Sequence, residues 1–421
     1  MGIINITSLR AGMMLAEDVR DRNGRFLASG GTALTDRHIK ILKMWGVIEA
    51  NIRGVTKEEA ESDRIFDLDP TALEASETIT RSRFALNDLD HPAVRELFRL
   101  CVARKAREIM NGEAIALANG QCADNAPPPE IRPAKTLSPD ASALLKNEIK
   151  LPTLPGIFLK INETLTRPNS SAFDIANLIG KDTTLSARLL KIVNSAFYGF
   201  PSKIDNLFRA VSIIGTNQLS TLATGVSLID AFWNVPSTFI DMKMFWRHSV
   251  ACGIVARSLA GHKNIQNTER LFVSGLFHDI GRLLLLHQAP ELACELLRAA
   301  RRNGHTLYQL ESERMGFNHA LLGGKLLEKW RLPFSLENAV ANHHEPLTSR
   351  SPLEPAIVNL ADIFTNAIAI GSSGQRLIPK LCPEVWKTID LSENVLPLIV
   401  KQADCQADEI FRFFYDDENE S

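Results

Sequence analysis

The chain has 421 residues, a length that predicts about two or three folded units. Hydrophobic residues make up 45% of the sequence and charged residues 23%, which excludes a globally disordered or fibrous chain. The formal net charge is −2, without a cluster of Lys and Arg, so we expect no nucleic-acid partner, because neutralising phosphates requires such a cluster.

No segment is typical of secretion or of membrane insertion. The stretch MGIINITSLRAGMML lacks a basic segment followed by an apolar run and a cleavage site, and no apolar run approaches the roughly 18 residues of a spanning helix. The cysteines have no CxxC spacing, which favours reduced thiols over a disulfide framework or zinc ribbon; they are Cys101, Cys122, Cys252, Cys294, Cys382 and Cys405. We therefore expect a cytoplasmic protein without a membrane span.

Residues 1–55 are predicted to form a small α+β module. The dipeptide Asn23-Gly24 lies between two strand-like runs and is a strong hairpin signal. Thr35 is expected to cap a short helix that buries one apolar face. The residues of that face are Ile39, Leu42 and Trp45, and a strand-like stretch from Val47 to Ile52 follows them.

The next two segments differ sharply in composition. Residues 56–118 form a helical connector, because the sequence from Ala72 to Ala114 is charged and carries apolar residues at helical spacing. Residues 119–150 are rich in proline and small polar residues, which predicts an exposed linker and a domain boundary.

Residues 151–412 are predicted to form an all-helical domain, since they repeat apolar faces at a period of about 3.6 residues without a convincing strand run. The block from Asn194 to Gly199 is interpreted as a helix end and turn that pack the first helices onto the rest of this domain. Residues 413–421 are expected to be a disordered acidic tail.

The most informative residues are histidines and aspartates within this helical domain. They are His248, His278, Asp279, His319, His343, His344 and Asp362. Imidazoles and carboxylates that converge on one point are the ligands of one or two divalent ions. The alternative for any single histidine is a hydrogen-bonded core position, and we prefer that interpretation for His38, His91, His262, His287 and His305.

The surroundings of these residues strengthen the metal hypothesis. Asp279 lies within Leu276–Leu286, a stretch that is apolar on every face and predicts a buried helix. An aspartate buried there without a cation or hydrogen-bond donors would cost several kcal/mol. Gly323 follows His319 by one helical turn and would allow a neighbouring helix to approach. Asp362 lies on a polar stripe with Asn359 and Asn366, which would suit a ligand held by supporting hydrogen bonds.

The order His248, His278-Asp279, Asp362 resembles the H…HD…D signature of HD-superfamily metal-dependent phosphohydrolases, and His278–Arg282 resembles the HDxGK variant of HD-GYP proteins. This resemblance implies two ligand sets: His248, His278, Asp279 and Asp362 for one ion, and Asp279, His319, His343 and His344 for a second. It also implies catalytic roles for Asp279 and for Arg282, which would contact phosphate. The sequence departs from the family at Arg282, where the family has Lys, and at Pro346, because no GYP motif follows His344-Glu345.

A closer resemblance covers residues from about Leu151 to about Pro346. The blocks LPTLP, KDTTLSARLL, VNSAFYG and AVSIIG, followed by the segment from Gly316 to Pro333, resemble the HDOD family (HD-related output domain) in family order. This resemblance implies a mainly α protein, in which an all-helical HDOD domain follows the small α+β module. It also implies a role in bacterial signal transduction.

Two functional hypotheses remain open at this point. The first is a signalling output protein that retains a divalent metal site and contacts a protein partner in its pathway. The second is a metal-dependent phosphohydrolase or phosphodiesterase whose ligand is a nucleotide or cyclic dinucleotide. One or two divalent ions are the expected cofactors, with Fe, Mn and Mg as the candidates; in the signalling protein the metal would be structural. Because the family lysine and the GYP motif are missing, we expect no efficient hydrolysis of cyclic di-GMP.

Overall fold

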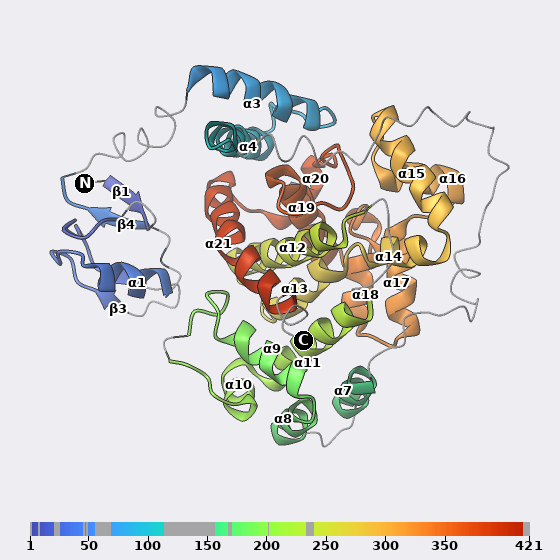
Figure 1. The fold of residues 1–421 in the computed structure, drawn as a ribbon, viewed down its shortest axis with the longest axis horizontal. Helices are drawn as coiled ribbons and strands as arrows, with labels where there is room; N and C mark the ends of the chain where they lie inside the picture. The colour runs from blue at the N-terminus through green and yellow to red at the C-terminus, as the bar shows by residue number, and fades with distance from the viewer. Residues whose placement is uncertain are drawn as a thin grey trace.

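The protein is mainly helical, with a few short strands near its N-terminus, which confirms the predicted fold class (Figure 1). The computed structural model describes residues 2–6, 9–20, 26–44, 47, 49–54, 69–112, 156–166, 171–200, 202–232 and 240–415. The predicted linker, residues 119–150, and the end of the predicted acidic tail, residues 416–421, lie outside the described residues.

In the N-terminal part, the described residues up to Gly54 form two small antiparallel sheets and one helix. Strand β1 (Gly2–Asn5) pairs with β4 (Glu49–Ile52), and β2 (Val19–Arg20) pairs with β3 (Phe26–Ala28) as the hairpin prediction requires. Helix α1 (Asp36–Met44) follows Thr35, whose Oγ1 accepts the His38 N–H at 3.2 Å, so the predicted cap is present. Ile39 and Leu42 are buried in a small separate core, whereas Trp45 lies outside the described residues.

The described residues of the predicted connector, 69–112, contain the helices α3 (Pro70–Arg83) and α4 (Pro92–Met110). Helix α4 buries Val94, Leu97 and Cys101 in the same core as the later helices. The Arg83 guanidinium donates to the Asn366 and Ala367 carbonyl oxygens. These contacts join the helix pair to the rest of the helical region.

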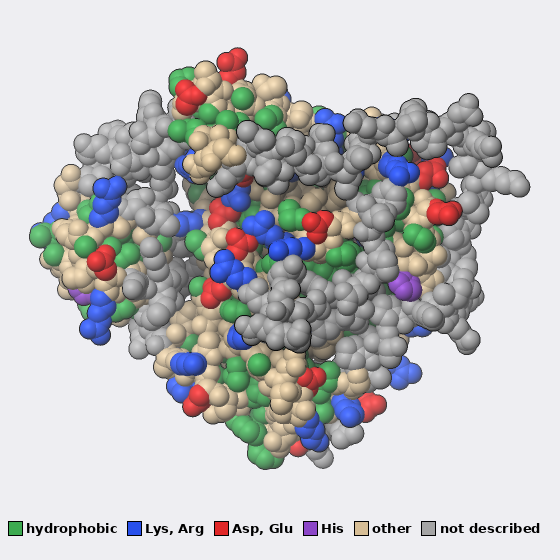
Figure 2. Space-filling model, in the orientation of Figure 1, with side chains coloured by type: hydrophobic (Ala, Val, Ile, Leu, Met, Phe, Trp, Pro, Cys, Tyr) green, Lys and Arg blue, Asp and Glu red, His purple; other side chains and the backbone are tan. Residues whose placement is uncertain are grey.

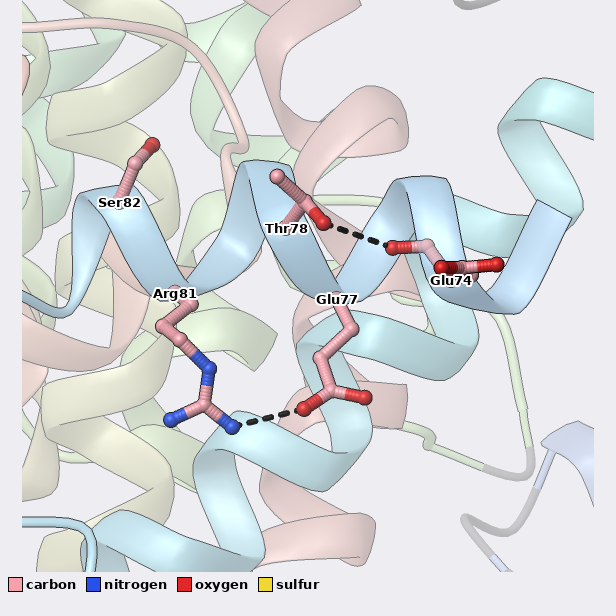
Figure 3. Close-up of a pocket in the computed structure, with 5 residues that line it drawn as sticks. All are labelled: Glu74, Glu77, Thr78, Arg81 and Ser82. Carbon is pink, nitrogen blue, oxygen red and sulfur yellow. Dashed lines mark hydrogen bonds and ion pairs between the residues drawn. The ribbon is translucent and has the colours of Figure 1, made fainter. Parts of the chain in front are cut away.

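The outer side of α3 carries a shallow hollow lined by the helix's own side chains (Figure 3). Arg81 pairs with Glu77 at 2.7 Å, and the Thr78 hydroxyl donates to the Glu74 carbonyl at 3.0 Å. Such pairs one turn apart are common on solvated helices and stabilise them weakly. We therefore interpret this hollow as an ordinary exposed helix face and not as a binding site.

From residue 156 onward, the described residues contain helices and no strand. The helices are α7 (Gly156–Thr166), α8 (Ala172–Gly180), α9 (Thr183–Val193), α10 (Leu207–Ile214), α11 (Thr216–Phe232), α12 (Met242–His262), α13 (Thr268–Phe277), α14 (Ile280–Gln288), α15 (Pro290–Asn303), α16 (Leu307–Met315), α17 (His319–Lys329), α18 (Phe334–Ala341), η1 (Pro346–Thr348), α19 (Leu353–Ile368), α20 (Pro383–Ile389), η2 (Glu393–Val395) and α21 (Leu396–Tyr415).

Helices α12, α13 and α19 lie at the centre of this region, surrounded by the other helices (Figure 1). Glycines permit the backbones of α12 and α13 to touch, because a Cβ atom on Gly275 would lie 2.7 Å from the Gly253 Cα atom. Helix α19 is buried at every position from Pro355 to Ile368. Residues on the inner faces of these helices therefore sit in a dry, closely packed interior.

The turn after α9 packs the first helices against this centre, as its sequence predicts. The Asn194 side chain caps the helix end and exchanges two hydrogen bonds with the Ile204 backbone, at 2.7 and 2.8 Å. Phe197 is buried, and the Arg257 guanidinium of α12 lies 4.0 Å from the centre of its ring. The cation–π contact fixes the turn onto α12.

The prediction of one continuous helix through His278 and Asp279 was wrong. Helix α13 ends at Phe277 and α14 begins at Ile280, and Asp279 has φ −98° and ψ 9°, outside the helical range. After this break α14 lies against α17, where a Cβ atom on Gly281 would come within 2.0 Å of the His319 carbonyl oxygen. An unbroken apolar run cannot distinguish one buried helix from two short ones that pack on different partners, so the sequence did not reveal the break.

Within the described residues, no helix is long and apolar enough to cross a bilayer. Lys and Arg side chains are intermixed with Asp and Glu on the face of the molecule shown in Figure 2. Pairs such as Arg247 with Asp408, 2.7 Å apart, are examples of this mixing. The mixture agrees with the near-neutral net charge of the sequence.

Candidate metal centre

Six helices, α12, α13, α14, α17, α18 and α19, bring the seven histidines and aspartates named from the sequence into one buried region. His248 comes from α12, His278 and Asp279 from the α13–α14 junction, and Asp362 from α19. His319 is the first residue of α17, and His343 and His344 follow α18. All are buried except His344, which is partly buried.

His248, His278 and Asp362 form the first cluster, which we call the aspartate group. Asp362 Oδ1 lies 3.3 Å from His248 Nε2 and 3.3 Å from His278 Nε2. Ligand atoms that surround one ion at about 2.0–2.2 Å are themselves about 3.0–3.4 Å apart. The spacing of this group therefore fits a single ion between the three side chains.

His319, His343 and His344 form the second cluster, the histidine group, whose ligand atoms lie within 4.8 Å of one another. His319 Nε2 is 2.9 Å from His344 Nε2, which is a hydrogen-bond distance. The His344 ring also stacks on Tyr308, with ring centres 4.3 Å apart. Two of the three imidazoles in this group thus already contact each other.

Asp279 lies between the two groups. Its Oδ2 is 3.4 Å from His278 Nε2, and its Oδ1 is 3.1 Å from His319 Nε2. Arg282 approaches the same Oδ1, with its Nε at 3.1 Å. Asp279 therefore has the position of a carboxylate shared by both groups.

Backbone carbonyls fix the orientation of two imidazoles. His278 Nδ1 lies 2.7 Å from the Gly275 carbonyl oxygen, and His343 Nδ1 lies 2.8 Å from the Val340 carbonyl oxygen. In a neutral ring, an Nδ1–H that donates to a carbonyl leaves the lone pair on Nε2. Both Nε2 atoms are thus presented as acceptors towards the interior of the site.

Several polar atoms in this buried region have no hydrogen-bond partner among the described residues. They are Nδ1 and Nε2 of His248, Nε2 of His278, Nε2 of His343, and both carboxylate oxygens of Asp279. The Nε2 atoms of His248 and His278 lie close to carboxylate oxygens of Asp279 and Asp362, but the ring N–H groups do not point at these oxygens with hydrogen-bond geometry. Unsatisfied buried groups in native proteins are rare, and imidazole nitrogens beside two carboxylates are suited to a divalent cation. The side chains therefore fit a metal ion.

The electrostatics favour the protonation states that metal ligands need at two of these side chains, Asp279 and His343. Burial by itself would raise the pKa of Asp279, but the neighbouring Arg282 and His278 hold it well below its usual value. Burial, together with the nearby His278 and His319, lowers the pKa of His343 to about 3. Around neutral pH, Asp279 is an anion and His343 is a neutral imidazole.

Two amides of α19 support the site from the polar stripe noted in the sequence. Asn366 Nδ2 donates to Asp362 Oδ1 at 2.7 Å, and Asn359 Nδ2 donates to the His343 carbonyl at 2.7 Å. Bonds of this kind orient metal ligands. The sequence analysis missed Glu311, which is buried and accepts from both the backbone N–H and Nδ1 of His319, at 2.8 and 2.5 Å.

A signal for Glu311 does exist in the sequence. The buried positions of α16 are Leu307, Leu310, Glu311 and Met315, so the glutamate occupies the apolar face of the helix. A charged residue on such a face requires a buried partner. Here the partner is His319.

Arg282 is enclosed within the protein. It is 2% exposed, its Nη1 donates to the Ser373 carbonyl at 2.9 Å, and its Nη2 lies 3.3 Å from His319 Nε2. The phosphate contact expected from the family resemblance would require the guanidinium to leave these partners. That contact stays a prediction.

Comparison with known proteins identifies the helical region. Residues 151–346 match the model of the HDOD domain family. These residues form an HDOD domain. The HDOD match includes every residue of both groups except Asp362, which α19 supplies from beyond its end.

Among curated proteins, the chain is 27% identical over 212 residues to an uncharacterized protein of Treponema pallidum (strain Nichols). That stretch is 50% of this chain but only 41% of the relative's length. The two proteins therefore share a part, and the relative extends well beyond it.

Solved structures share the fold. An HDOD domain protein of unknown function from Geobacter sulfurreducens has a TM-score of 0.54 at 22% identity, covering 65% of this chain and 95% of its own. A protein from Marinobacter aquaeolei VT8, provisionally described as a signal transduction protein, has a TM-score of 0.51 at 19% identity, covering 65% and 60%. At these identities the comparisons establish the fold of the HDOD domain.

Proposed function

We propose that this protein is a bacterial signalling output protein whose HDOD domain binds a divalent cation through His248, His278, Asp279 and Asp362. The observation that carries the metal assignment is the set of buried imidazole and carboxylate atoms without hydrogen-bond partners. The signalling role is supported by the HDOD family match and by the provisional description of the Marinobacter protein with the same fold. A protein partner in the same pathway would bind the domain and respond to its conformation.

Some residues of the site would bind the ion, and others orient these ligands. His278 and Asp279 lie at the helix break, which lets adjacent residues face one site from the ends of two helices. The Gly275 carbonyl orients His278, and Asn366 orients Asp362. When bound, a divalent ion would neutralise the buried carboxylates and could polarise a phosphate or activate a water molecule. Mn, Fe and Mg remain the candidates, since imidazole nitrogens suit Fe and carboxylate oxygens suit Mn and Mg.

A phosphohydrolase acting on a nucleotide or cyclic dinucleotide is the alternative function. It is favoured by the placement of all the family's metal-ligand residues around one buried region. Two observations weigh against it. Arg282 is engaged with Asp279 and Ser373, and the chain after Glu345 enters the short helix η1 in place of a GYP motif. We therefore give signalling precedence.

Metal analysis of the purified full chain tests the proposal. After incubation with Mn²⁺ and dialysis, the wild-type protein should retain the metal, while His278→Ala and Asp362→Ala should lose it. His305→Ala is the matched control, because His305 is an exposed histidine that belongs to neither group. A wild-type protein that retains no Mn²⁺, Fe²⁺ or Mg²⁺ would refute the metal site.

The same preparations decide between the two functions. Assays with cyclic di-GMP and with a generic phosphodiester should show no efficient turnover in the Mn²⁺-loaded protein. Robust turnover that disappears in Asp279→Ala would replace the signalling proposal with the hydrolase alternative.

A further inference from the structure

The Arg282 side chain contacts two residues of the ligand set expected for a second ion, Asp279 and His319. We propose that Arg282 serves as a built-in cation for the histidine group, so that the site holds one divalent ion and not two. This inference rests on the proposed metal-binding function and specifies its stoichiometry. It is carried by the hydrogen bonds and charges around His319.

The lone pair of His319 is already in use. Glu311 Oε2 accepts a hydrogen bond from His319 Nδ1 at 2.5 Å, so the lone pair of the neutral ring is on Nε2. That Nε2 lies 3.3 Å from Arg282 Nη2 and 2.9 Å from His344 Nε2, both of which are nitrogens able to donate. A metal ion would have to displace both neighbours to reach His319.

Within the described residues, only one imidazole of the histidine group has an Nε2 atom without a partner. His344 Nε2 is committed to His319, whereas His343 Nε2 has no partner among the described residues. A divalent ion needs several ligand atoms from the protein, and one imidazole with a shared carboxylate is too few to hold it. The aspartate group differs, since the Nε2 atoms of His248 and His278 are both without partners in the part of the chain that the structure describes.

The positive charge of Arg282 also disfavours a second metal ion, as its contact with His319 does. The guanidinium carries a positive charge, and its Nε is 3.1 Å from Asp279 Oδ1, the oxygen that faces His319. It thus neutralises the carboxylate that a second ion would need. Two cations on the same oxygen would repel each other strongly in an interior of low dielectric constant.

The guanidinium is held in this position from the opposite side as well. Nη1 donates to the carbonyl of Ser373, a fully buried residue beyond the end of α19. With Asp279, His319 and Ser373 around it and 2% of its surface exposed, Arg282 has no open direction in which to swing away. Its position is therefore a fixed part of the site.

The number of bound ions tests this inference in the full-length protein. With Mn²⁺ as the only added metal, elemental analysis should give about one ion per wild-type chain and about two per Arg282→Gln chain. The double variant Arg282→Gln/His319→Ala should return to about one ion. Arg314→Gln, on the exposed side of α16, is the matched control and should stay at one. Electron paramagnetic resonance gives an independent measure: an isolated Mn²⁺ signal in the wild type and a spin-coupled pair in Arg282→Gln.

A second variant keeps the test valid if Arg282→Gln does not fold. His319→Ala in the wild-type background should still bind one Mn²⁺ with affinity within about two-fold of wild type, since His319 is not a ligand of that ion. Two ions in the wild type, one ion in a folded Arg282→Gln protein, or loss of the ion in His319→Ala would each overturn the inference while leaving the metal site intact. No ion in any variant would instead refute the proposed function, and this inference with it.

Discussion

The aspartate group and the histidine group contain similar residues but differ in what their nitrogens already bind. In the aspartate group, the Nε2 atoms of His248 and His278 have no hydrogen-bond partner among the described residues. In the histidine group, His319 is surrounded by Glu311, Arg282 and His344. The comparison teaches that the type and closeness of potential ligands do not define a metal site, because a lone pair that is already engaged is not available to an ion.

The largest expected effect comes from Gly281→Ala, which would disturb both groups at once. The new Cβ atom would lie 2.0 Å from the His319 carbonyl oxygen and 2.7 Å from the Gly323 nitrogen, so α14 and α17 would have to separate. We expect a loss of about 3 kcal/mol in the free energy of unfolding, measured with urea, and loss of bound Mn²⁺.

Gly261→Ala is the control for this substitution, because a Cβ atom on Gly261 of α12 would meet nothing within 4 Å. It should change stability by no more than about 1 kcal/mol, in the stabilising direction. Equal destabilisation by the two alanines would show that the close approach of α14 to α17 is unimportant.

The second largest effect is the gain in stability on addition of Mn²⁺, which tests the aspartate group separately from the histidine group. A ligand that binds only the folded state at 100 times its Kd stabilises that state by about 2.7 kcal/mol. Thermal unfolding should show this gain in the wild type and in His319→Ala, but not in His278→Ala. An equal gain in His278→Ala would place the ion elsewhere.

The third effect is confined to the histidine group. Glu311→Gln removes the charge that accepts two hydrogen bonds from His319 in a fully buried setting. Stability measured by urea unfolding should fall by about 2 kcal/mol, the usual range for a buried charge-assisted bond, while the Mn²⁺ stoichiometry stays the same. Glu313→Gln, on the exposed side of the same helix, should change stability by less than about 0.5 kcal/mol. A loss of Mn²⁺ in Glu311→Gln would count against the separation of the two groups.

The smallest effect concerns the orientation of Asp362. Asn366→Ala removes the amide that donates to Asp362 Oδ1 at 2.7 Å, so we expect Mn²⁺ affinity measured by calorimetry to fall about ten-fold. Asn87→Ala removes a half-buried amide that bonds to the Ile378 and Pro379 carbonyls, away from the site, and should leave the affinity unchanged. Similar losses in both variants would mean that general destabilisation, and not ligand orientation, lowers the affinity.

The sequence was sufficient to name the histidines and aspartates that the fold brings together. Each is a residue type with few structural uses in an apolar interior, and Asp279 in its apolar run is the clearest example. The mainly helical fold and the hairpin before Phe26 were equally accessible, because they depend on local spacing and turn residues. That these residues hold an ion stays a prediction.

Features that depend on tertiary contacts were not accessible. The break at His278-Asp279 reflects the packing of α14 on α17, and the enclosure of Arg282 depends on the Ser373 carbonyl, which is 91 residues away along the chain. Neither contact changes the spacing of apolar and polar residues along the sequence, so the sequence pattern could not predict it. The sequence therefore indicated which residues meet, but not which of their lone pairs are still available.

The positions of the proposed ligands along the chain determine when, during synthesis of the protein, the metal site can form. His248 is the first ligand of the aspartate group to be synthesised and Asp362 the last, and α19 carries Asp362 after nearly all of the other central helices have been made. An ion can therefore not nucleate the folding of the first helices on the ribosome. Retention of the ion would instead report that synthesis has passed α19 and that the centre of the HDOD domain has closed.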